Sequence, residues 1–147
     1  MDRLTPEQRS KNMAAVKSKD TKPELRLRKE LWRRGLRYRK NCGEVIGKPD
    51  IIFPWYKIAV FCDGEFWHGY DWEKNKSRIK SNTKYWHAKI NRNMERDNEV
   101  NIRLQREGWI LLRYWEHQIR KNLSECADEI EAIVREKKAE YAAWNAK

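Results

Sequence analysis

The sequence predicts one α/β domain in which a mixed central sheet is flanked by helices. Three observations support this fold class. A capped helical pattern comes first, two short β-rich runs follow it, and a long amphipathic helical pattern leads to one more apolar strand and a last helix. Residues 20–140 hold all of these elements, so we expect them to form a single domain.

The first 19 residues precede this domain and are interpreted as a basic helix or arm. Met13 and Val16 lie three residues apart among cations that include Arg9, Lys11 and Lys17. So short a segment is hardly stable alone as a helix in water. We therefore expect it to pack on its own domain or in a DNA groove.

The first helix of the domain is predicted to begin at Thr21 and to run to residue 34, before Gly35. Thr21-Lys-Pro-Glu24 has the pattern of a capping box, in which Glu24 is the reciprocal acid. Residues 36–39 alternate in polarity and are predicted to be the first strand.

Residues 47–68 are the stretch with the strongest chemical signal. The runs 51–53 and 57–62 are predicted to be adjacent strands separated at Pro54. If they pair, Asp50 lies beside the end of the second run at Cys62 and Asp63, with His68 a few residues on. Two carboxylates beside an imidazole suit a site in which a base activates water.

Each of these residues also has an ordinary structural interpretation. Asp50 follows a proline, Asp63-Gly is a turn signal, and a histidine beside aromatic residues is usually only packed. The combination favours function, because Phe66-Trp67-His68 puts large apolar side chains in a loop next to charged groups.

Further along the chain, residues 69–81 form a lysine-rich loop in this interpretation, either a second basic surface or a solvated segment. Residues 82–107 are predicted to be a long helix ended by Gly108. Asp97 falls on its apolar face, where a carboxylate needs a partner. We interpret it as a partner for His68 or, alternatively, as one half of an ion pair with an arginine.

The C-terminal third is predicted to hold a strand over residues 109–115 and a helix that begins near residue 122. The alanine-rich residues 141–147 are expected to be a frayed tail.

Composition narrows the possible functions. The net charge is +11, and residues 1–48 hold 15 Lys and Arg against 6 Asp and Glu, whereas residues 49–147 hold 18 against 16. Such an uneven basic surface is typical of nucleic-acid binding, and the 8 tryptophans add faces on which bases stack.

Other classes of protein are disfavoured. No apolar run approaches the roughly 20 residues of a membrane span, and the N-terminus lacks an apolar signal core, so we expect a cytoplasmic protein. The 3 cysteines are widely spaced and form no evident zinc set, which suits free thiols in a reducing compartment.

Several motifs together resemble one known family, the bacterial very-short-patch mismatch-repair endonucleases. They are Arg9-Ser-Lys-Asn-Met13, Gly47-Lys-Pro-Asp50, Val60-Phe-Cys-Asp-Gly-Glu-Phe-Trp-His-Gly69, Tyr85-Trp86, Glu95-Arg-Asp97, Gly108-Trp109 and Trp115-Glu116. The match covers roughly residues 8–118 in order and at compatible spacing.

The resemblance implies a restriction-endonuclease-like core of the PD-(D/E)xK superfamily. It also implies a magnesium-dependent nick on the 5′ side of the thymine in a T·G mismatch, which arises when 5-methylcytosine deaminates. Asp50 would bind the metal together with the main-chain carbonyl of Cys62. His68 would be the general base, Asp97 would orient it, and Glu24 would match a further acid of the active site.

The resemblance also implies how DNA is held. Phe66, Trp67 and Trp86 would match aromatic residues that wedge into the base stack beside the mismatch, and Met13 a residue inserted from the other groove. A wedge discriminates because unstacking costs less at a mismatch. The basic residues of the N-terminal arm would contact phosphates; they are Arg9, Lys11 and Lys17.

Two departures from the family pattern stand out. Family members commonly hold a structural zinc, but the matching positions here are Glu65, Tyr70, Trp72 and His117, so we expect no zinc. Tyr70 and Trp72 are expected to fill that space with apolar packing. Asp63 stands where the family often has a second histidine, and it could bind the metal, bind a second metal or help to hold His68.

The main interpretation is thus a monomeric, magnesium-dependent enzyme that nicks mismatched duplex DNA in the bacterial cytoplasm, at the nucleoid, with mismatch-repair proteins as possible partners. One alternative is a restriction- or homing-type nuclease that acts on intact duplex DNA. Another is a catalytically silent protein that binds distorted DNA.

Overall fold

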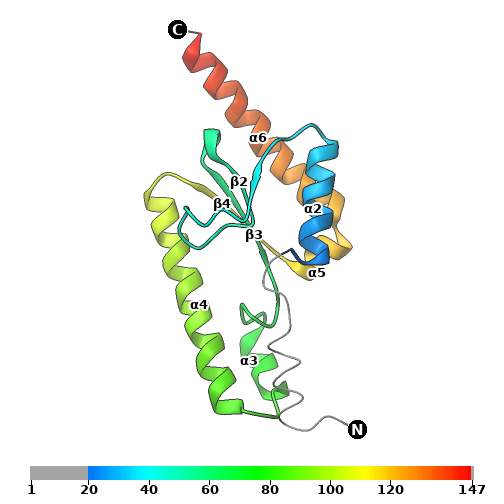
Figure 1. Cartoon of the computed structure of the whole chain (residues 1–147), viewed down its shortest axis with the longest axis vertical. Helices are drawn as coiled ribbons and strands as arrows, with labels where there is room; N and C mark the ends of the chain where they lie inside the picture. The colour runs from blue at the N-terminus through cyan, green and yellow to red at the C-terminus, as the bar shows by residue number, and fades with distance from the viewer. Residues whose placement is uncertain (1–19, 147) are drawn as a thin grey trace.

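The computed structural model describes residues 20–146 (Figure 1). Its helices are α2 (Lys22–Arg33), α3 (Trp72–Asn75), α4 (Thr83–Arg106), α5 (Glu116–Lys121) and α6 (Leu123–Asn145). Its strands are β1 (Arg39–Lys40), β2 (Ile51–Phe53), β3 (Ile58–Asp63) and β4 (Ile110–Trp115). Two short 3₁₀ helices, η1 (Pro54–Tyr56) and η2 (Lys76–Arg78), complete these elements.

The four strands form one mixed sheet in the order β1-β2-β3-β4. The pairs β1–β2 and β2–β3 are antiparallel, whereas β3 and β4 are parallel and are joined by the crossover helix α4. A crossover of this kind is what a parallel pair requires. The predicted mixed sheet and the predicted pairing of β2 with β3 are confirmed.

Helices cover both faces of the sheet, as predicted, with α4 on one side and α2, α5 and α6 on the other (Figure 1). Alternation along β3 divides the core, because successive strand residues point to opposite faces. Ile58 and Val60 pack with Leu27 of α2 and Ile130 of α6, among others. Ala59 and Phe61 pack on the α4 side, against Val100 and Leu104.

The structure differs from the sequence prediction at several element boundaries. The first strand is only Arg39–Lys40, because Leu36 is buried in the core beside α2 instead of extending the sheet. The expected loop 69–81 contains α3 and η2. Helix α5 was not predicted.

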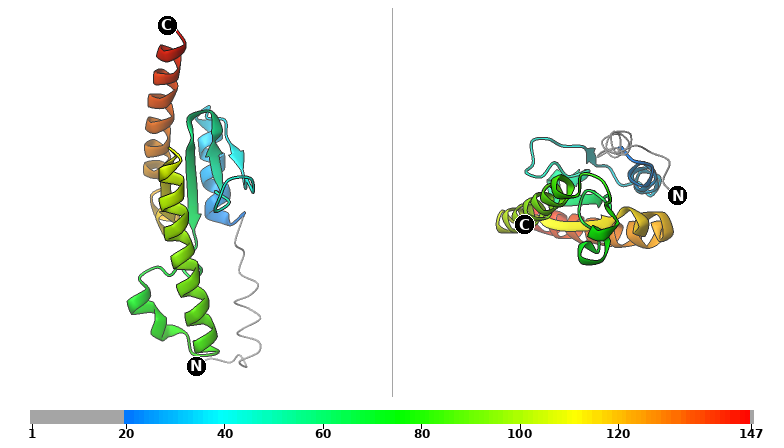
Figure 2. Two further views of the ribbon diagram at one scale, coloured as in Figure 1. Left: turned by 90° about the vertical axis from the view of Figure 1, so that its left-hand side faces the viewer. Right: turned by 90° about the horizontal axis from the view of Figure 1, so that it is seen from below.

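The expected frayed tail is also different, because α6 continues as a helix to Asn145 and extends beyond the sheet (Figure 2). Alanine favours the helix here, and Tyr141 packs edge-on against Tyr56 with ring centroids 6.2 Å apart. Of the helices described here, none is long and apolar enough to span a membrane.

Candidate active site

Asp50 and Cys62 come together because β2 and β3 pair. The Asp50 N–H donates to the carbonyl of Val60 over 3.1 Å, and the Cys62 N–H donates to Asp50 Oδ2 over 2.6 Å. Alternate residues of a strand turn their polar main-chain groups to the same edge. The main-chain groups of Cys62 therefore face the Asp50 carboxylate just beyond the last pair of the β2–β3 ladder.

A polar cavity of about 520 Å³ opens at this end of the sheet. The cavity is lined by the loop before β2, by the end of β3 and by the histidine that follows β3. Its lining includes Asp50, Cys62, Asp63 and His68.

His68 and Asp97 form the predicted pair. His68 Nδ1 lies 2.6 Å from Asp97 Oδ2. Asp97 comes from the middle of α4, and the loop approaches that helix closely because Gly69, at φ +68°, has no side chain. A Cβ there would lie 2.4 Å from Met94 Sδ. Since an ionised carboxylate only accepts hydrogen bonds, His68 carries a proton on Nδ1. The other ring nitrogen, Nε2, lies 3.7 Å from Asp63 Oδ1.

Arg113 is a site residue that sequence reasoning missed. It lies on β4 opposite Phe61, and its Nη1 donates to both oxygens of the buried Asp63 over 3.0 Å. The same nitrogen lies 3.9 Å from Asp97 Oδ1, and Nε donates to Asn101 over 2.7 Å. The available signal was a single arginine in an otherwise apolar strand. Arg113 therefore joins the two acids that flank His68.

Glu24 is fully buried at the start of α2. Thr21 is the N-cap, as predicted, and its Oγ1 accepts from the Glu24 N–H over 3.4 Å. The Glu24 carboxylate does not return to Thr21 but accepts from the Asp20 N–H over 2.9 Å and from Arg28 over 3.1 Å. Arg28 in turn binds Asp20 over 2.8 Å. The Glu24 carboxylate is therefore hydrogen-bonded within α2 and by the main chain just before it, and its charge also acts on Asp50.

The electrostatics of the site follow from burial of several acids together. Burial raises the pKa of Asp50 to about 7, and the charges of Glu24 and Asp63 add to this effect. Burial also raises the pKa of Asp63, although His68 and Arg113 oppose the rise. For His68, burial lowers the pKa, but the Asp97 hydrogen bond and the charge of Asp63 outweigh it and raise the pKa above its ordinary value.

This set of groups fits a hard divalent cation. An acid whose pKa is raised by neighbouring acids gains from a nearby positive charge. Carboxylate and carbonyl oxygens are the donors that magnesium prefers, and magnesium usually takes only one or two protein carboxylates. Within residues 20–146, no group of three or more His, Cys, Asp or Glu side chains is arranged to hold a metal ion.

The three predicted wedge residues form one aromatic cluster beside His68. Ring centroids lie 5.2 Å apart for Phe66 and Trp67, and 5.4 Å apart for Phe66 and Trp86. Lys89 Nζ lies 5.3 Å from the centroid of Trp67. The indole N–H groups of Trp67 and Trp86 are buried, and neither has a hydrogen-bond partner in the described part of the chain. The cluster thus combines apolar ring faces, two indole N–H donors that have no partner among residues 20–146, and the ammonium group of Lys89.

Side-chain contacts occupy the region in which the resemblance implied that a zinc site is missing. Glu65 Oε1 lies 2.7 Å from the main-chain nitrogen of His117 and 2.7 Å from its Nδ1. Tyr70 packs edge-on against Trp115 and His117. Trp72 packs against His87 instead. Hydrogen bonds between the loop of residues 64–70 and α5 therefore occupy this region.

Four of the predicted DNA contacts lie outside the described residues. They are Met13, Arg9, Lys11 and Lys17.

The sheet is mixed, with a carboxylate at the start of one strand and an acid at the end of the next, and a histidine beside them is held by another acid. These features are those of the metal-dependent DNA endonucleases with a restriction-endonuclease-like fold. Residues 1–74 match the family model described as "DNA mismatch endonuclease Vsr".

Similar proteins agree with this class. The chain is 58% identical over 93% of its length to "Type II nicking enzyme V.NmeDIP" of Neisseria meningitidis serogroup C, covering 93% of that protein. It is 51% identical to "Type II nicking enzyme V.HpaIIP" of Haemophilus parainfluenzae, with 93% and 98% of the two chains covered. It is 38% identical to "DNA mismatch endonuclease Vsr" of Escherichia coli, with 76% and 71% covered. The chain belongs to the Vsr family of DNA nicking endonucleases.

Proposed function

We propose that this chain cuts one strand of duplex DNA by magnesium-assisted hydrolysis, with His68 as the general base. The observation that carries the proposal is the His68–Asp97 pair at the edge of the cavity that Asp50 lines. The Asp50 carboxylate and the Cys62 carbonyl would hold the ion. When bound, magnesium supplies positive charge beside the scissile phosphate.

The protein's own groups account for the movement of the proton. His68 Nε2 accepts a proton from the attacking water, since Nδ1 is already bound to Asp97. Asp97 then stabilises the imidazolium that forms. Arg113 holds Asp63 in place and limits the competition of Asp63 for the same imidazole nitrogen.

The names of the most similar relatives reported above favour a defined site in intact duplex DNA as the substrate. Both are called "Type II nicking enzyme", which supports the restriction-type alternative over mismatch repair. In this proposal the chain is a type II enzyme that nicks one strand.

The aromatic cluster supports a second candidate substrate, a T·G mismatch nicked 5′ of the thymine. The three aromatic rings beside His68 pack edge-to-face, and large apolar rings of this kind suit insertion into a base stack, where unstacking costs less at a mismatch than in paired DNA. The description of the matched family, "DNA mismatch endonuclease Vsr", also supports this candidate.

Strand-specific nicking of labelled duplexes separates these candidates. One duplex of random flanking sequence carries a single T·G mismatch, its control carries T·A at that position, and both are compared in magnesium and in chelator. Nicking of the thymine strand of the mismatch alone supports the mismatch substrate. Nicking of the paired control at a defined sequence supports the type II substrate, and an absence of magnesium-dependent cutting in every duplex contradicts the proposal.

A further inference from the structure

The far end of the sheet carries a second hollow surface that the nicking reaction does not use. It surrounds the turn between β2 and β3, which lies at the opposite end of these strands from Asp50 and Asp63. At about 3.3 Å per residue, the six residues of β3 put it roughly 17 Å from the active site. We call it the hairpin-end surface and define it by Trp55, Lys57, Lys138, Tyr141 and Trp144.

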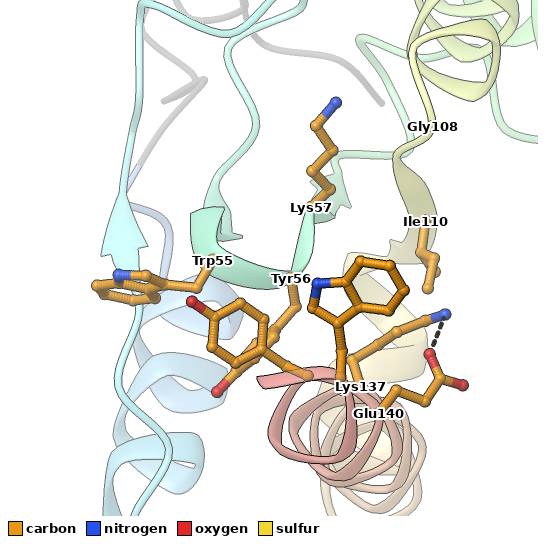
Figure 3. Close-up of a pocket in the computed structure, with 9 residues that line it drawn as sticks. Trp55, Tyr56, Lys57, Gly108, Ile110, Lys137 and Glu140 are labelled. Atoms are coloured by element: carbon orange, nitrogen blue, oxygen red, sulfur yellow. Dashed lines mark hydrogen bonds and ion pairs between the residues drawn. The ribbon is translucent and has the colours of Figure 1, made fainter. Parts of the chain in front are cut away.

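Two cavities meet at this surface. The first, of about 570 Å³, lies between the Trp55–Lys57 turn and the C-terminal part of α6 (Figure 3). The second, of about 350 Å³, lies between the same turn and the middle of α6, and Trp55 and Tyr56 line both. The turn therefore stands between two hollows as a ridge.

The aromatic side chains here are unusually exposed. The exposed fraction is 60% for Trp55, 56% for Tyr141 and 76% for Trp144. Exposed apolar area gathered in one place typically marks a binding surface. Their rings are large flat faces on which another ring can stack.

Cations outnumber acids around these rings. The cations that line the two cavities are Arg37, Lys57, Arg135, Lys137 and Lys138. The acid among the lining residues is Glu140, which Lys137 binds over 3.0 Å. Arg135 is also paired, with Glu131 over 2.7 Å. Lys138 has no ion pair within the described part of the chain and remains exposed.

We propose that the hairpin-end surface binds single-stranded nucleic acid, with unpaired bases stacked on Trp55 and Trp144 and phosphates held by the surrounding cations. Aromatic faces set in a basic groove are the features that bind single strands without strong sequence preference. A paired duplex hides its base faces within the stack, so these rings fit unpaired bases. The family already acts on DNA, and this surface adds a contact remote from the cut.

The charge pattern disfavours a second copy of the chain as the occupant. In a symmetric pair the same cations would face one another across the interface, and like charges in contact oppose association. A polyanion gains from those charges instead.

A photo-crosslinking oligonucleotide tests the proposal directly. We expect a labelled oligothymidylate that carries 5-iodouracil to crosslink to peptides that contain Trp55, Tyr141 or Trp144. In fluorescence anisotropy, the Trp55→Ala and Trp144→Ala variants bind the oligonucleotide roughly 10-fold more weakly each. Leu25→Ala is the control, because Leu25 is also exposed, at 47%, but lines neither cavity.

The outcome is separable from the nicking reaction. Trp55→Ala and Trp144→Ala should leave magnesium-dependent nicking of duplex DNA unchanged, so a failure of one proposal does not mimic a failure of the other. Crosslinks confined to the aromatic cluster of Phe66, Trp67 and Trp86 would overturn the proposal. Sedimentation that shows dimers lost in Trp55→Ala would assign the surface to self-association instead.

Discussion

His68 and His117 form the same kind of pair with a carboxylate, yet they lie in different surroundings. His68 Nδ1 lies 2.6 Å from Asp97, and His117 Nδ1 lies 2.7 Å from Glu65. His117 adds a second bond to the same oxygen through its main-chain nitrogen, and its ring packs against Tyr70. His68 instead lines the cavity that holds Asp50.

The difference shows what distinguishes a base from a structural tie. Both acids fix the orientation of an imidazole, but only the other ring nitrogen can take a proton from a substrate or water. That nitrogen of His68 lies beside the cavity and 3.7 Å from Asp63. We therefore propose that His68 is the base, and that His117 and Glu65 hold the loop of residues 64–70 in place.

Replacing the two histidines gives the largest expected contrast. His68→Ala should slow nicking by about 10²- to 10⁴-fold, because a positioned general base contributes an effect of this size. His117→Ala should slow it by less than about 10-fold, since it loosens the loop without removing the base. Single-turnover nicking at saturating enzyme measures both, and equal losses would erase the distinction.

Replacing Arg113 tests whether the buried acid Asp63 beside His68 needs this one cation for the stability of the fold. Arg113→Ala should lower the free energy of unfolding by about 3–5 kcal/mol, because it leaves the buried Asp63 without its ion-pair partner. Adding Asp63→Asn should recover part of that loss, because no buried charge then remains unpaired. Urea denaturation of the single and double variants provides the values. A double variant as unstable as the sum of both single changes would contradict this role.

The raised pKa of Asp50 predicts that the stability of the fold depends on pH. Since the folded-state pKa is about 7 and the ordinary value is 3.8, the folded protein binds this proton more tightly than the unfolded chain. Stability from this group is therefore complete below about pH 4 and is lost as the pH rises through about 7, by roughly 4 kcal/mol.

Asp50→Asn isolates that contribution from the other buried acids and from His68. In chelator, its free energy of unfolding should fall less between pH 4.5 and pH 7.5 than that of the unmodified chain. If the free energy of unfolding of the two proteins changed with pH in parallel, Asp50 would not be an acid with a raised pKa.

Asp97 should give a smaller effect on nicking than His68. Asp97→Asn keeps the side-chain shape but loses the negative charge that stabilises the imidazolium, so we expect a loss of about 10- to 100-fold. Glu65→Gln is the matched control on the other histidine and should change nicking little. If Glu65→Gln is as harmful as Asp97→Asn, the two pairs serve the reaction alike.

Local patterns predicted the fold and much of the site. Period-2 and period-3.6 patterns indicated β2, β3, α4 and β4, and the apolar face of α4 pointed to Asp97 as a partner for His68. The pairing of β2 with β3 then brings Asp50 to Cys62. These contacts follow from short-range sequence signals.

Contacts set by long-range register could not be predicted in the same way. Arg113 reaches Asp63 only because β4 pairs in parallel with β3, in a register that places it opposite Phe61. The Glu24 carboxylate binds Asp20 and Arg28 in place of the capping-box nitrogen. Helix α5 is short and begins directly after β4, so no loop separates the two patterns.

The dependence of nicking on Asp50 and magnesium tests the central claim most directly. One labelled duplex substrate of the enzyme is incubated with the unmodified chain and with Asp50→Ala, in magnesium and in chelator. The proposed site predicts one cut strand only with the unmodified chain in magnesium. A comparable nick by Asp50→Ala, or by the unmodified chain in chelator, would contradict it.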